Sequence, residues 1–514
     1  MIGGVSWPEL ARLAQAHLFL SGCAVLAAVL IGLPVAILAA HDRRVRAPLL
    51  GIISLLQTIP GLALLALFYP LLLFLARATG WPIPALGFLP ALLALGIYAL
   101  LPVVRNGVAA IQGIEPVLVE AAHGLGMSRW QRLRLVELPL GAPVILAGIR
   151  TAAVWTIGTA TLATTIGQSS LGDLIFSGLQ TEDWQRVLVG CVAAAALAIL
   201  VDAMLALVET GIAGRSRRRL GAGLAILIAA LAMTLAPVSD GRASTGRLVV
   251  IGAKNFSEQY ILAQLIEERL RAAGYRTQRR DNLGSAIAYR ALAAGDIGVY
   301  VDYAGTLWAN VLRRTDTPDG DTMLKALAQE LERRDKVRVL GPLGFENAYA
   351  FAMIRARAQA LEITTLDDLA RIAPRLRLGT DLEFLNRPEW QAVEEHYHPV
   401  FRAMRPYSPT FMYRALADGA VDVISAFSSD GRIVALDLVT LDDPRGALPR
   451  YDALLLLNGG AADDPRLVAA LQPLIGAISI ERMRGANWMV DRDENKRTPA
   501  QAAQWLSGEI DRTR

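Results

Sequence analysis

The sequence predicts two fold classes in one chain, an α-helical membrane domain followed by an α/β domain outside the membrane. Of the 514 residues, 54% are hydrophobic and 19% are charged, which is too apolar for a soluble protein of this length. The apolar residues are also segregated, because no charged residue occurs in 47–76 or in 81–104. Such runs exceed the ~20 residues that cross the hydrocarbon core of a bilayer. Beyond Ser239 the pattern changes to mixed charge, alternating apolar residues and turn signals, as in soluble α/β domains.

Six apolar segments are expected to span the membrane, and the arginine distribution orients them. The segments are residues 17–40, 49–75, 83–104, 143–166, 187–208 and 220–236. The arginine-rich connections between them lie at residues 43–46, 129–134 and 215–219. Because positively charged loops stay in the cytoplasm, all three connections are expected there, and everything after residue 236 is expected outside.

The last apolar segment, residues 220–236, has two interpretations. It is short and follows the arginines of 215–219, so it can be an uncleaved anchor or an internal signal sequence that is removed. We favour the anchor, because it would tether the exported half to its own membrane domain. The expected domains are then a membrane domain at 1–212, an anchor and linker at 213–245, and an extracytoplasmic domain at 246–514.

A charged island at residues 120–139, between two apolar blocks, is expected to form a cytoplasmic helix–turn–helix. A first short helix over 116–125 is followed by a glycine break and then by an arginine-rich helix. The stretch resembles the EAA coupling loop of ABC-importer permeases, which docks on a separate ATPase; an ordinary interfacial loop is the alternative. The resemblance implies coupling roles for Glu120, Ala121, Ala122, Gly126, Leu138 and Pro139.

The exported half contains an internal repeat that predicts where a ligand would bind. Residues 290–303 are echoed 124 residues later by residues 414–427, each with a helix end, a glycine stop and an apolar strand. The two strands end in Tyr303 and Phe427. Ligands of open α/β sheets bind beyond the carboxyl ends of the strands, so both rings are expected at a cleft between two lobes. The alternative is that both rings belong to the core.

The start of the exported half predicts a third contributor to such a cleft. Residues 247–252 are expected to form a buried strand and 258–273 a helix, with Ser257 as a plausible N-cap. Lys254 lies in the loop between them, where it can reach a ligand near the exposed helix terminus. A solvated surface lysine is the ordinary alternative.

Residues 246–510 resemble the substrate-binding proteins of the glycine betaine, choline and carnitine ABC importers. The sequence motifs that carry the resemblance lie at 252–259, 302–307, 347–352, 384–388, 426–432 and 449–453. The membrane half resembles permeases of the same family at 57–65 and 149–163. A fusion in this order also occurs in that family, including importers similar to the ergothioneine transporter. The implied fold is a type I ABC permease joined to a two-lobed, type II binding domain.

The resemblance implies a ligand site of two halves. In that family aromatic rings hold a trimethylammonium group, and by motif these would be Tyr303, Tyr349, Phe427 and Tyr451. The carboxylate of the solute would be held by Lys254, Thr306 and Arg387. A quaternary ammonium has no N–H to donate, so cation–π attraction must select it, whereas a buried carboxylate needs charge-assisted hydrogen bonds. Phe427 departs from the family's usual tyrosine, which leaves the choice among betaine-like solutes open.

The implied partners follow from what the sequence contains and lacks. No Gly-x-x-x-x-Gly-Lys-Ser/Thr phrase occurs, so a separate cytoplasmic ATPase is expected, and two copies of the chain are expected to pair. The other expected partners are a small quaternary-ammonium solute and the lipid of a bacterial inner (plasma) membrane, and neither nucleic acid, metal nor cofactor is expected. The remaining alternatives are an ergothioneine-type importer and a membrane-anchored solute sensor. A hydrolase is disfavoured, because the chain lacks His-Glu-x-x-His and Gly-x-Ser-x-Gly.

Overall fold

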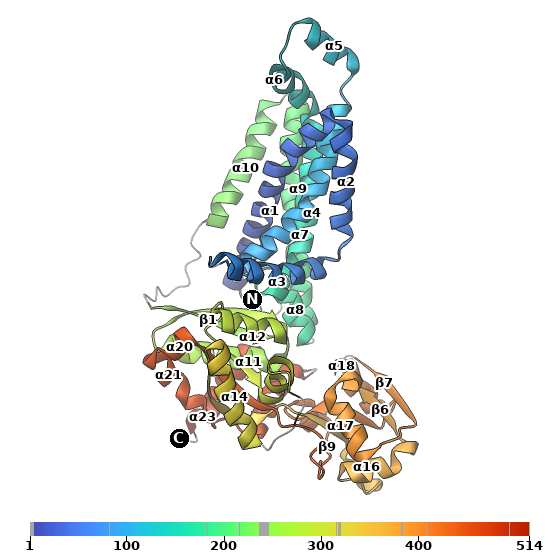
Figure 1. Ribbon diagram of the computed structural model, residues 1–514, viewed down its shortest axis with the longest axis vertical. Helices are drawn as coiled ribbons and strands as arrows, with labels where there is room; N and C mark the ends of the chain where they lie inside the picture. Colours follow the sequence, from blue (N-terminus) through green and yellow to red (C-terminus); the bar gives the residue numbers. More distant parts are fainter. Residues whose placement is uncertain are drawn as a thin grey trace. The chain divides into compact units, whose positions relative to one another are not determined.

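The chain folds into two units, one in each half of the sequence. The computed structural model describes residues 5–81, 83–181, 183–214, 216–235, 246–314, 316, 320–381, 384–407, 409–492 and 494–512. Unit 1 is Met1–Leu179 with Asp183–Ala243, and unit 2 is Gln180–Glu182 with Ser244–Arg514 (Figure 1). Most of the expected linker, residues 236–245, lies outside the described residues, so its boundaries stay a prediction.

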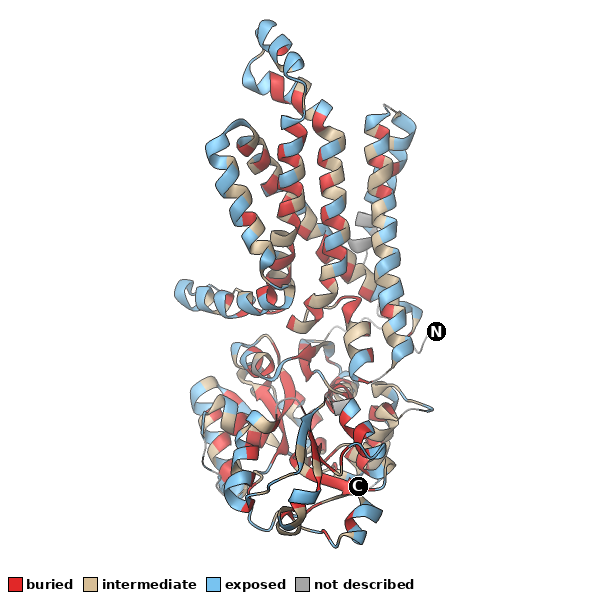
Figure 2. Ribbon diagram, turned by 90° about the vertical axis from the view of Figure 1, so that its right-hand side faces the viewer, coloured by how far each residue is buried: buried red, intermediate tan, exposed pale blue. Residues whose placement is uncertain are grey.

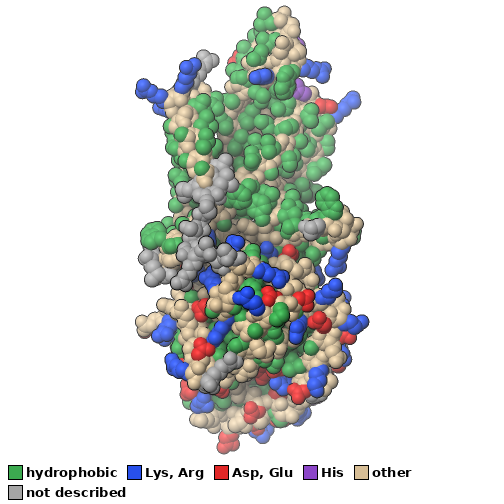
Figure 3. Space-filling model, turned by 90° about the vertical axis from the view of Figure 1, so that its left-hand side faces the viewer, with side chains coloured by type: hydrophobic (Ala, Val, Ile, Leu, Met, Phe, Trp, Pro, Cys, Tyr) green, Lys and Arg blue, Asp and Glu red, His purple; other side chains and the backbone are tan. Residues whose placement is uncertain are grey.

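Unit 1 is helical. Its α-helices are α1 (Trp7–His41), α2 (Arg43–Thr58), α3 (Gly61–Thr79), α4 (Phe88–Gln112), α5 (Pro116–Gly124), α6 (Arg129–Arg132), α7 (Leu138–Ala160), α8 (Gly172–Gln180), α9 (Trp184–Ala213) and α10 (Arg217–Leu235). Within the described chain, five helical stretches are long and apolar enough to cross a membrane: Trp7–His41, Gly61–Thr79, Phe88–Gln112, Arg129–Ile166 and Trp184–Ala213. The expected sixth segment falls on α10, where several side chains lie outside the described residues. Hydrophobic side chains cover most of the visible face of this unit (Figure 3).

Small residues bring the central helices α1, α4 and α7 close together. A Cβ on Gly107 of α4 would lie 2.7 Å from the Cβ of Ala36 on α1, and one on Gly148 of α7 would lie 2.5 Å from the Cβ of Asn106. Such contacts are typical of membrane helix interfaces, where dispersion between close backbones replaces the hydrophobic effect. The buried residues of unit 1 accordingly line the contacts between these helices (Figure 2).

One predicted span is wrong. Residues 49–75 do not form a single helix, because α2 ends at Thr58 and α3 begins at Gly61. Ile59 between them is extended, with φ −69° and ψ 125°. Pro60 explains the break, since proline disfavours helical conformation at the residue before it and has no N–H to continue the helix. In Figure 1, α3 runs across the direction of α2.

Unit 2 consists of two lobes, each built on a five-stranded sheet. The first sheet has the order β2-β1-β3-β10-β4, with β1 (Leu248–Lys254), β2 (Arg276–Leu283), β3 (Val299–Tyr303), β4 (Val337–Glu346) and β10 (Asp452–Asn458). The second has the order β7-β6-β8-β5-β9, with β5 (Tyr349–Ile354), β6 (Arg377–Thr380), β7 (Ala403–Pro406), β8 (Val423–Phe427) and β9 (Leu438–Thr440). In both sheets the first three strands in this order are parallel, and the fourth, β10 or β5, runs antiparallel to both of its neighbours, so the lobes share one topology.

Helices pack around both sheets (Figure 1). The first lobe contains α11 (Ser257–Ala272), α12 (Ser285–Ala294), α13 (Ala304–Thr306), α14 (Gly320–Asp335), α20 (Gly459–Ala462), α21 (Pro465–Leu471), α22 (Ile480–Asp491) and α23 (Pro499–Arg512). The second contains α15 (Arg355–Ala360), α16 (Leu366–Ile372), α17 (Pro388–Tyr397), α18 (Pro409–Ala417) and α19 (Arg432–Ala435). The chain crosses between the lobes twice, after β4 and before β10, and these crossovers carry much of the site described below.

The predicted repeat is confirmed as equivalent elements of the two lobes. α12 ends at Ala294, is capped by Gly295, with φ +85°, and leads into β3; α18 is followed by Gly419, with φ +68°, and then by β8. Glycine suits both stops, because a left-handed residue carries a steric cost for any side chain with a Cβ. β3 and β8 occupy the middle of their sheets, where they place Tyr303 and Phe427 at their carboxyl ends.

Candidate functional site

Lys254 is buried and paired, and it is not a solvated surface lysine. It ends β1, its side chain is 3% exposed, and its ammonium forms an ion pair with the Asp302 carboxylate. Asp302 also accepts hydrogen bonds from the Tyr300 hydroxyl at 2.6 Å and from the backbone N–H of Tyr303 at 2.8 Å. Lys254 Nζ lies 5.1 Å from the centroid of the Tyr303 ring. The structure therefore brings Lys254 and Tyr303 together and adds Asp302, whose pairing with Lys254 no local sequence pattern indicates.

The hydroxyl of Tyr303 belongs to a buried polar network. It donates to Glu258 Oε1 at 2.5 Å and accepts from Gln259 Nε2 at 3.0 Å. Asn347 and Asn487 donate to the same Glu258 carboxylate at 3.2 and 2.9 Å. Burial raises the pKa of Glu258 even though these hydrogen bonds favour its charged form. Burial and the neighbouring Glu258 raise the pKa of Tyr303 well above its ordinary value, so its hydroxyl stays protonated.

Arg387 is held by a carboxylate of its own helix. Its Nε lies 3.1 Å from Glu389 Oε2 and its Nη2 lies 3.0 Å from Glu389 Oε1, a two-point contact at the start of α17. Arg387 Nη2 also lies 3.4 Å from the Tyr451 hydroxyl, which in turn donates to Glu389. Burial opposes the charge on each partner, but the ion pair prevails, raising the pKa of Arg387 and lowering that of Glu389. Glu389 is 3% exposed and was missed in the sequence, although it follows Arg387 by two positions.

An aromatic group in the second lobe lies against Arg387 through the ring of Tyr349. Tyr349 and Phe427 lie directly opposite each other on β5 and β8, with ring centroids 4.8 Å apart. Phe384 packs on Tyr349 at the same centroid distance. The Arg387 guanidinium carbon lies 5.3 Å from the Tyr349 centroid. Four predicted site residues, Arg387, Tyr349, Phe427 and Tyr451, therefore belong to one continuous cluster.

Tyr451 joins this cluster to the first lobe. Its ring covers Gly305, where a Cβ would lie 2.5–2.7 Å from ring carbons, so the position accepts only glycine in this arrangement. Gly305 and the predicted Thr306 form α13, which directly follows Tyr303. The backbone N–H of Asn347 donates to the Tyr451 carbonyl at 3.0 Å, which ties the two crossover segments together. All seven predicted residues thus lie along one path through both lobes.

Comparison with known proteins gives the family. Residues 247–508 match the family described as the substrate binding domain of ABC-type glycine betaine transport systems, and residues 32–214 match the binding-protein-dependent transport system inner membrane component. The chain belongs to the ABC importers, as a permease fused to a substrate-binding domain. Its permease lies in the inner membrane and its binding domain lies outside, as the sequence predicts.

Three similar proteins span different parts of the chain. The ergothioneine transport permease/ergothioneine binding protein EgtU of Helicobacter pylori (strain G27) is 28% identical over 486 residues, 92% of this chain and 85% of that protein. The choline transport system permease protein OpuBB of Bacillus subtilis (strain 168) is 39% identical over 204 residues, 40% of this chain and 88% of that protein. A crystal structure of a glycine betaine/carnitine/choline ABC transporter is 28% identical, covers 51% of this chain and 98% of that chain, and has a TM-score of 0.47.

The importer's second candidate site is the segment 116–139, called the coupling loop below. The predicted helix–turn–helix is confirmed: α5 is followed by Gly126, with φ +72°, and then by α6. Glu120, Ala121 and Ala122 lie on α5. Leu138 and Pro139 begin α7, directly after a π-helical turn at Leu133–Glu137.

Buried charges fasten the coupling loop to the membrane helices. Arg132 Nε lies 2.7 Å from Glu137 Oε1, and Glu137 Oε2 lies 3.2 Å from Nε2 of His41 at the end of α1. An Arg132 nitrogen also lies 2.7 Å from His123 Nε2 on α5. Leu125 and Trp130, by contrast, are 77% and 66% exposed. A firmly held loop with an exposed apolar tip can transmit movement between a partner and the helix bundle, and its exposed tip was missed in the sequence.

Proposed function

We propose that this importer subunit carries a quaternary-ammonium solute of the betaine class and is driven by a separate cytoplasmic ATPase. The observation that supports the solute class is the cluster in which the half-buried Arg387 guanidinium lies against the Tyr349 ring and the Tyr451 hydroxyl, with Phe427 packed on Tyr349. Ring faces attract a cation that cannot donate hydrogen bonds, with ~0.5–2 kcal/mol for each desolvated contact. Trimethylated solutes that carry a carboxylate match both halves of such a site.

The two ends of the solute would meet different residues. Tyr303, Tyr349, Phe427 and Tyr451 would face the ammonium group. Lys254, Thr306 and Arg387 would act on the carboxylate, with Arg387 as the direct donor and Lys254 acting from its ion pair with Asp302. Because Glu389 occupies two guanidinium N–H groups, an incoming carboxylate has to share Arg387 with it or replace it. This competition favours a solute whose cation is at the same time attracted by Glu389.

A trimethylammonium amino acid of the ergothioneine type is the second candidate solute. The relative that covers 92% of this chain carries that solute's name, and it has the same fused organisation. Phe427, which has no hydroxyl, leaves the aromatic half of the site more apolar than the family's usual tyrosine would, and this suits a larger or less polar solute.

The motor and the pairing complete the proposal. The coupling loop would dock on the ATPase, with Glu120, Ala121, Ala122 and Gly126 shaping the docked turn and Leu138-Pro139 joining it to α7. Exposed Trp130 supplies an anchor of the residue type that is enriched at binding hot spots, and exposed Leu125 adds apolar surface. Two copies of the chain would pair in the membrane to enclose a pathway that one set of helices leaves open.

A thermal-shift panel on the full chain in detergent tests the solute class. Glycine betaine, choline and ergothioneine are compared with glycine and ethanolamine, which keep the carboxylate of glycine betaine or the hydroxyl of choline but lack the methyl groups. A ligand that binds only the folded state raises the unfolding temperature. The proposal predicts shifts for methylated members only. Equal shifts for glycine and glycine betaine, or shifts for neither methylated solute nor ergothioneine, contradict it.

A further inference from the structure

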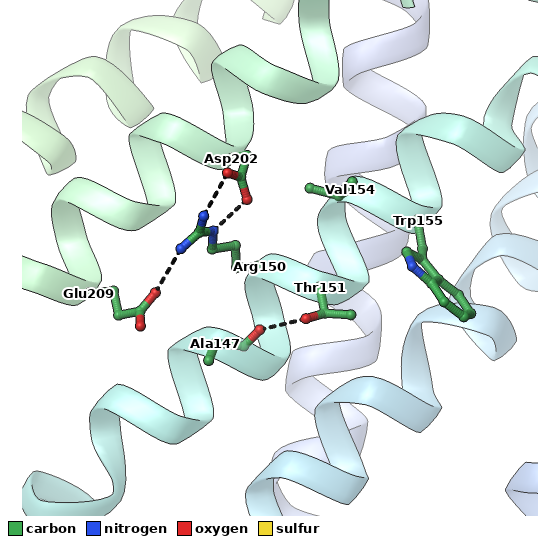
Figure 4. Close-up of a pocket in the computed structure, with 7 residues that line it drawn as sticks. All are labelled: Ala147, Arg150, Thr151, Val154, Trp155, Asp202 and Glu209. Atoms are coloured by element: carbon green, nitrogen blue, oxygen red, sulfur yellow. Dashed lines mark hydrogen bonds and ion pairs between the residues drawn. The ribbon is translucent and has the colours of Figure 1, made fainter. Parts of the chain in front are cut away.

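Two membrane helices of the permease face each other with ionisable side chains. Arg150 is the only charged residue of α7, and Asp202 and Glu209 are the only acidic residues of α9. The guanidinium contacts Asp202 with two nitrogens, one of them 2.7 Å from Oδ2, and its Nη1 lies 3.4 Å from Glu209 Oε2 (Figure 4). Asp202 alone can neutralise Arg150, so Glu209 brings a surplus negative charge.

The contact lies deep in the bilayer. Arg150 is 12 residues beyond Leu138, where α7 leaves the coupling loop, and Asp202 is 11 residues before Ala213, where α9 ends near the cytoplasmic arginines. At 1.5 Å per residue, both lie ~17–18 Å from the cytoplasmic ends of their helices. The hydrocarbon core is ~30 Å thick, so Arg150 and Asp202 are near its middle, whereas Glu209, four residues before Ala213, lies ~6 Å from the cytoplasmic end of α9.

The charged side chains border a hollow and are not enclosed between the helices. The side chains of Arg150, Asp202 and Glu209 are 37%, 33% and 24% exposed. With Ala147, Thr151, Val154 and Trp155 they line a hollow of about 360 Å³. Trp155 is 59% exposed. Charged groups at the depth of Arg150 and Asp202 are costly against lipid and mark pathways for ions or solutes, so this face, with Glu209 at its cytoplasmic end, is expected to border the pathway.

We propose that this hollow is a transit site for the cationic head of the solute, with Glu209 as its anion and Trp155 as its ring. The site rests on the proposed function, because it needs a solute that carries an ammonium group. Tryptophan is the strongest cation–π partner among side chains, and the surplus carboxylate supplies the attraction that the Arg150–Asp202 pair cannot. The volume of the hollow is within the range of small-molecule sites.

A second copy of the chain could also cover the face that contains the hollow. The surplus negative charge of Glu209 disfavours this arrangement. If this face lay on the two-fold axis of a pair, each patch would meet its own copy and the surplus Glu209 carboxylates would oppose each other. Facing a pathway between the copies, the same residues would instead provide two cation-attracting walls. Glu209 and Trp155 thus become residues that select the solute after it leaves the binding domain.

Uptake into proteoliposomes that contain the full chain and its ATPase tests the transit site. The solutes are choline, a cation, and glycine betaine, a zwitterion, and the variants are Glu209→Gln and the charge-preserving Glu209→Asp. Glu209→Gln is expected to lower the maximal uptake rate of choline about tenfold and that of glycine betaine less, while Glu209→Asp keeps most of the choline uptake. Solute affinity measured by calorimetry on the same full-length preparations is expected to be equal in all three proteins.

The Trp155 pair tests the ring separately. Trp155→Phe is expected to retain more choline uptake than Trp155→Leu, because a weaker ring face remains. Choline uptake by Glu209→Gln at the wild-type rate overturns the transit site. Equal losses of choline uptake in Glu209→Gln and Glu209→Asp, together with a lowered unfolding temperature, also overturn it, because they indicate that Glu209 holds the helices together. Dissociation of the paired chains in Glu209→Gln assigns the face to the second copy and also overturns it. Lack of any quaternary-ammonium uptake by the wild type refutes the proposed function instead.

Discussion

The Tyr303 hydroxyl donates to the buried Glu258 carboxylate at 2.5 Å and thereby ties the end of β3 to the start of α11. Asn487 of α22 and Asn347 of the first crossover donate to the same carboxylate. Asn487 also donates to the Ser429 carbonyl of the second lobe at 2.8 Å. One predicted ligand residue is thus also part of the network that fixes the two lobes at their crossovers.

Replacing Tyr303 by Phe is expected to cost stability more than ligand affinity. The ring face that would attract the cation remains, but Glu258 loses a hydrogen bond in a buried site, at a cost of ~1–3 kcal/mol. Thermal unfolding of the full chain in detergent should show a lower midpoint, with solute affinity reduced only slightly. A double-mutant cycle with Glu258→Gln provides the control, because the two losses should be non-additive. Additive effects, or a large loss of affinity at unchanged stability, would count against the shared role.

Glu258 also predicts a pH dependence of stability. Burial raises its pKa above the ordinary value for a glutamate, so folding favours the protonated form. Glu258 therefore contributes most to the free energy of unfolding at pH values below the ordinary glutamate pKa. This contribution is lost as the pH rises through the raised pKa of the folded state, and it does not change further above that pKa. Glu258→Gln, which cannot ionise, should abolish this decline. Unfolding midpoints of both proteins across acidic to neutral pH measure the difference, and parallel curves would contradict the assignment.

Arg387→Ala separates the two halves of the solute site. It should weaken glycine betaine binding by ~2–5 kcal/mol, as when one partner of a buried charge pair is removed. Choline, which has no carboxylate, should lose much less, because the Glu389 charge left beside Tyr451 still attracts a cation. Calorimetry of both solutes with Arg387→Ala and with Glu389→Gln provides the comparison. Equal small losses for the two solutes would refute the carboxylate role.

Gly126→Pro in the coupling loop should abolish solute-stimulated ATP hydrolysis without affecting solute binding. Gly126 has φ +72°, which proline cannot adopt, and its N–H donates to the His123 carbonyl at 2.9 Å. Glu120→Lys should have the same effect by reversing a charge on α5. Gly124→Ala is the matched control, because its added Cβ would meet nothing within 4 Å. Normal stimulation of the reconstituted complex by solute in Gly126→Pro would show that the loop docks elsewhere.

The sequence predicted local features better than pairings. The repeated helix, glycine and strand around Gly295 and Gly419 were foreseeable, because turn chemistry and strand alternation are local. The helix–turn–helix with Gly126 was predicted for the same reason. Pro60 lies inside the predicted span 49–75, yet one helix ends before it and a second begins after it, because Ile59 before it is extended.

The ion pairs of the candidate site were not predictable in this way. Lys254 and Asp302 are 48 positions apart, and only the pairing of β1 with β3 brings them together. The sequence shows Glu389 two positions after Arg387. Its burial against Tyr451 could not be predicted, because it depends on the packing of the crossover against α17. Motif resemblance therefore supplied the candidate residues, whereas the structure shows which of their charges already have partners.

Calorimetric titration of the purified full chain tests the central claim most directly. Glycine betaine, proline betaine, carnitine, choline and ergothioneine are compared with an uncharged sugar and an ordinary amino acid. The account predicts micromolar or tighter binding for at least one quaternary-ammonium solute and none for the sugar or the amino acid. Binding of the sugar or the amino acid, with no response to any of the five methylated solutes, would contradict it.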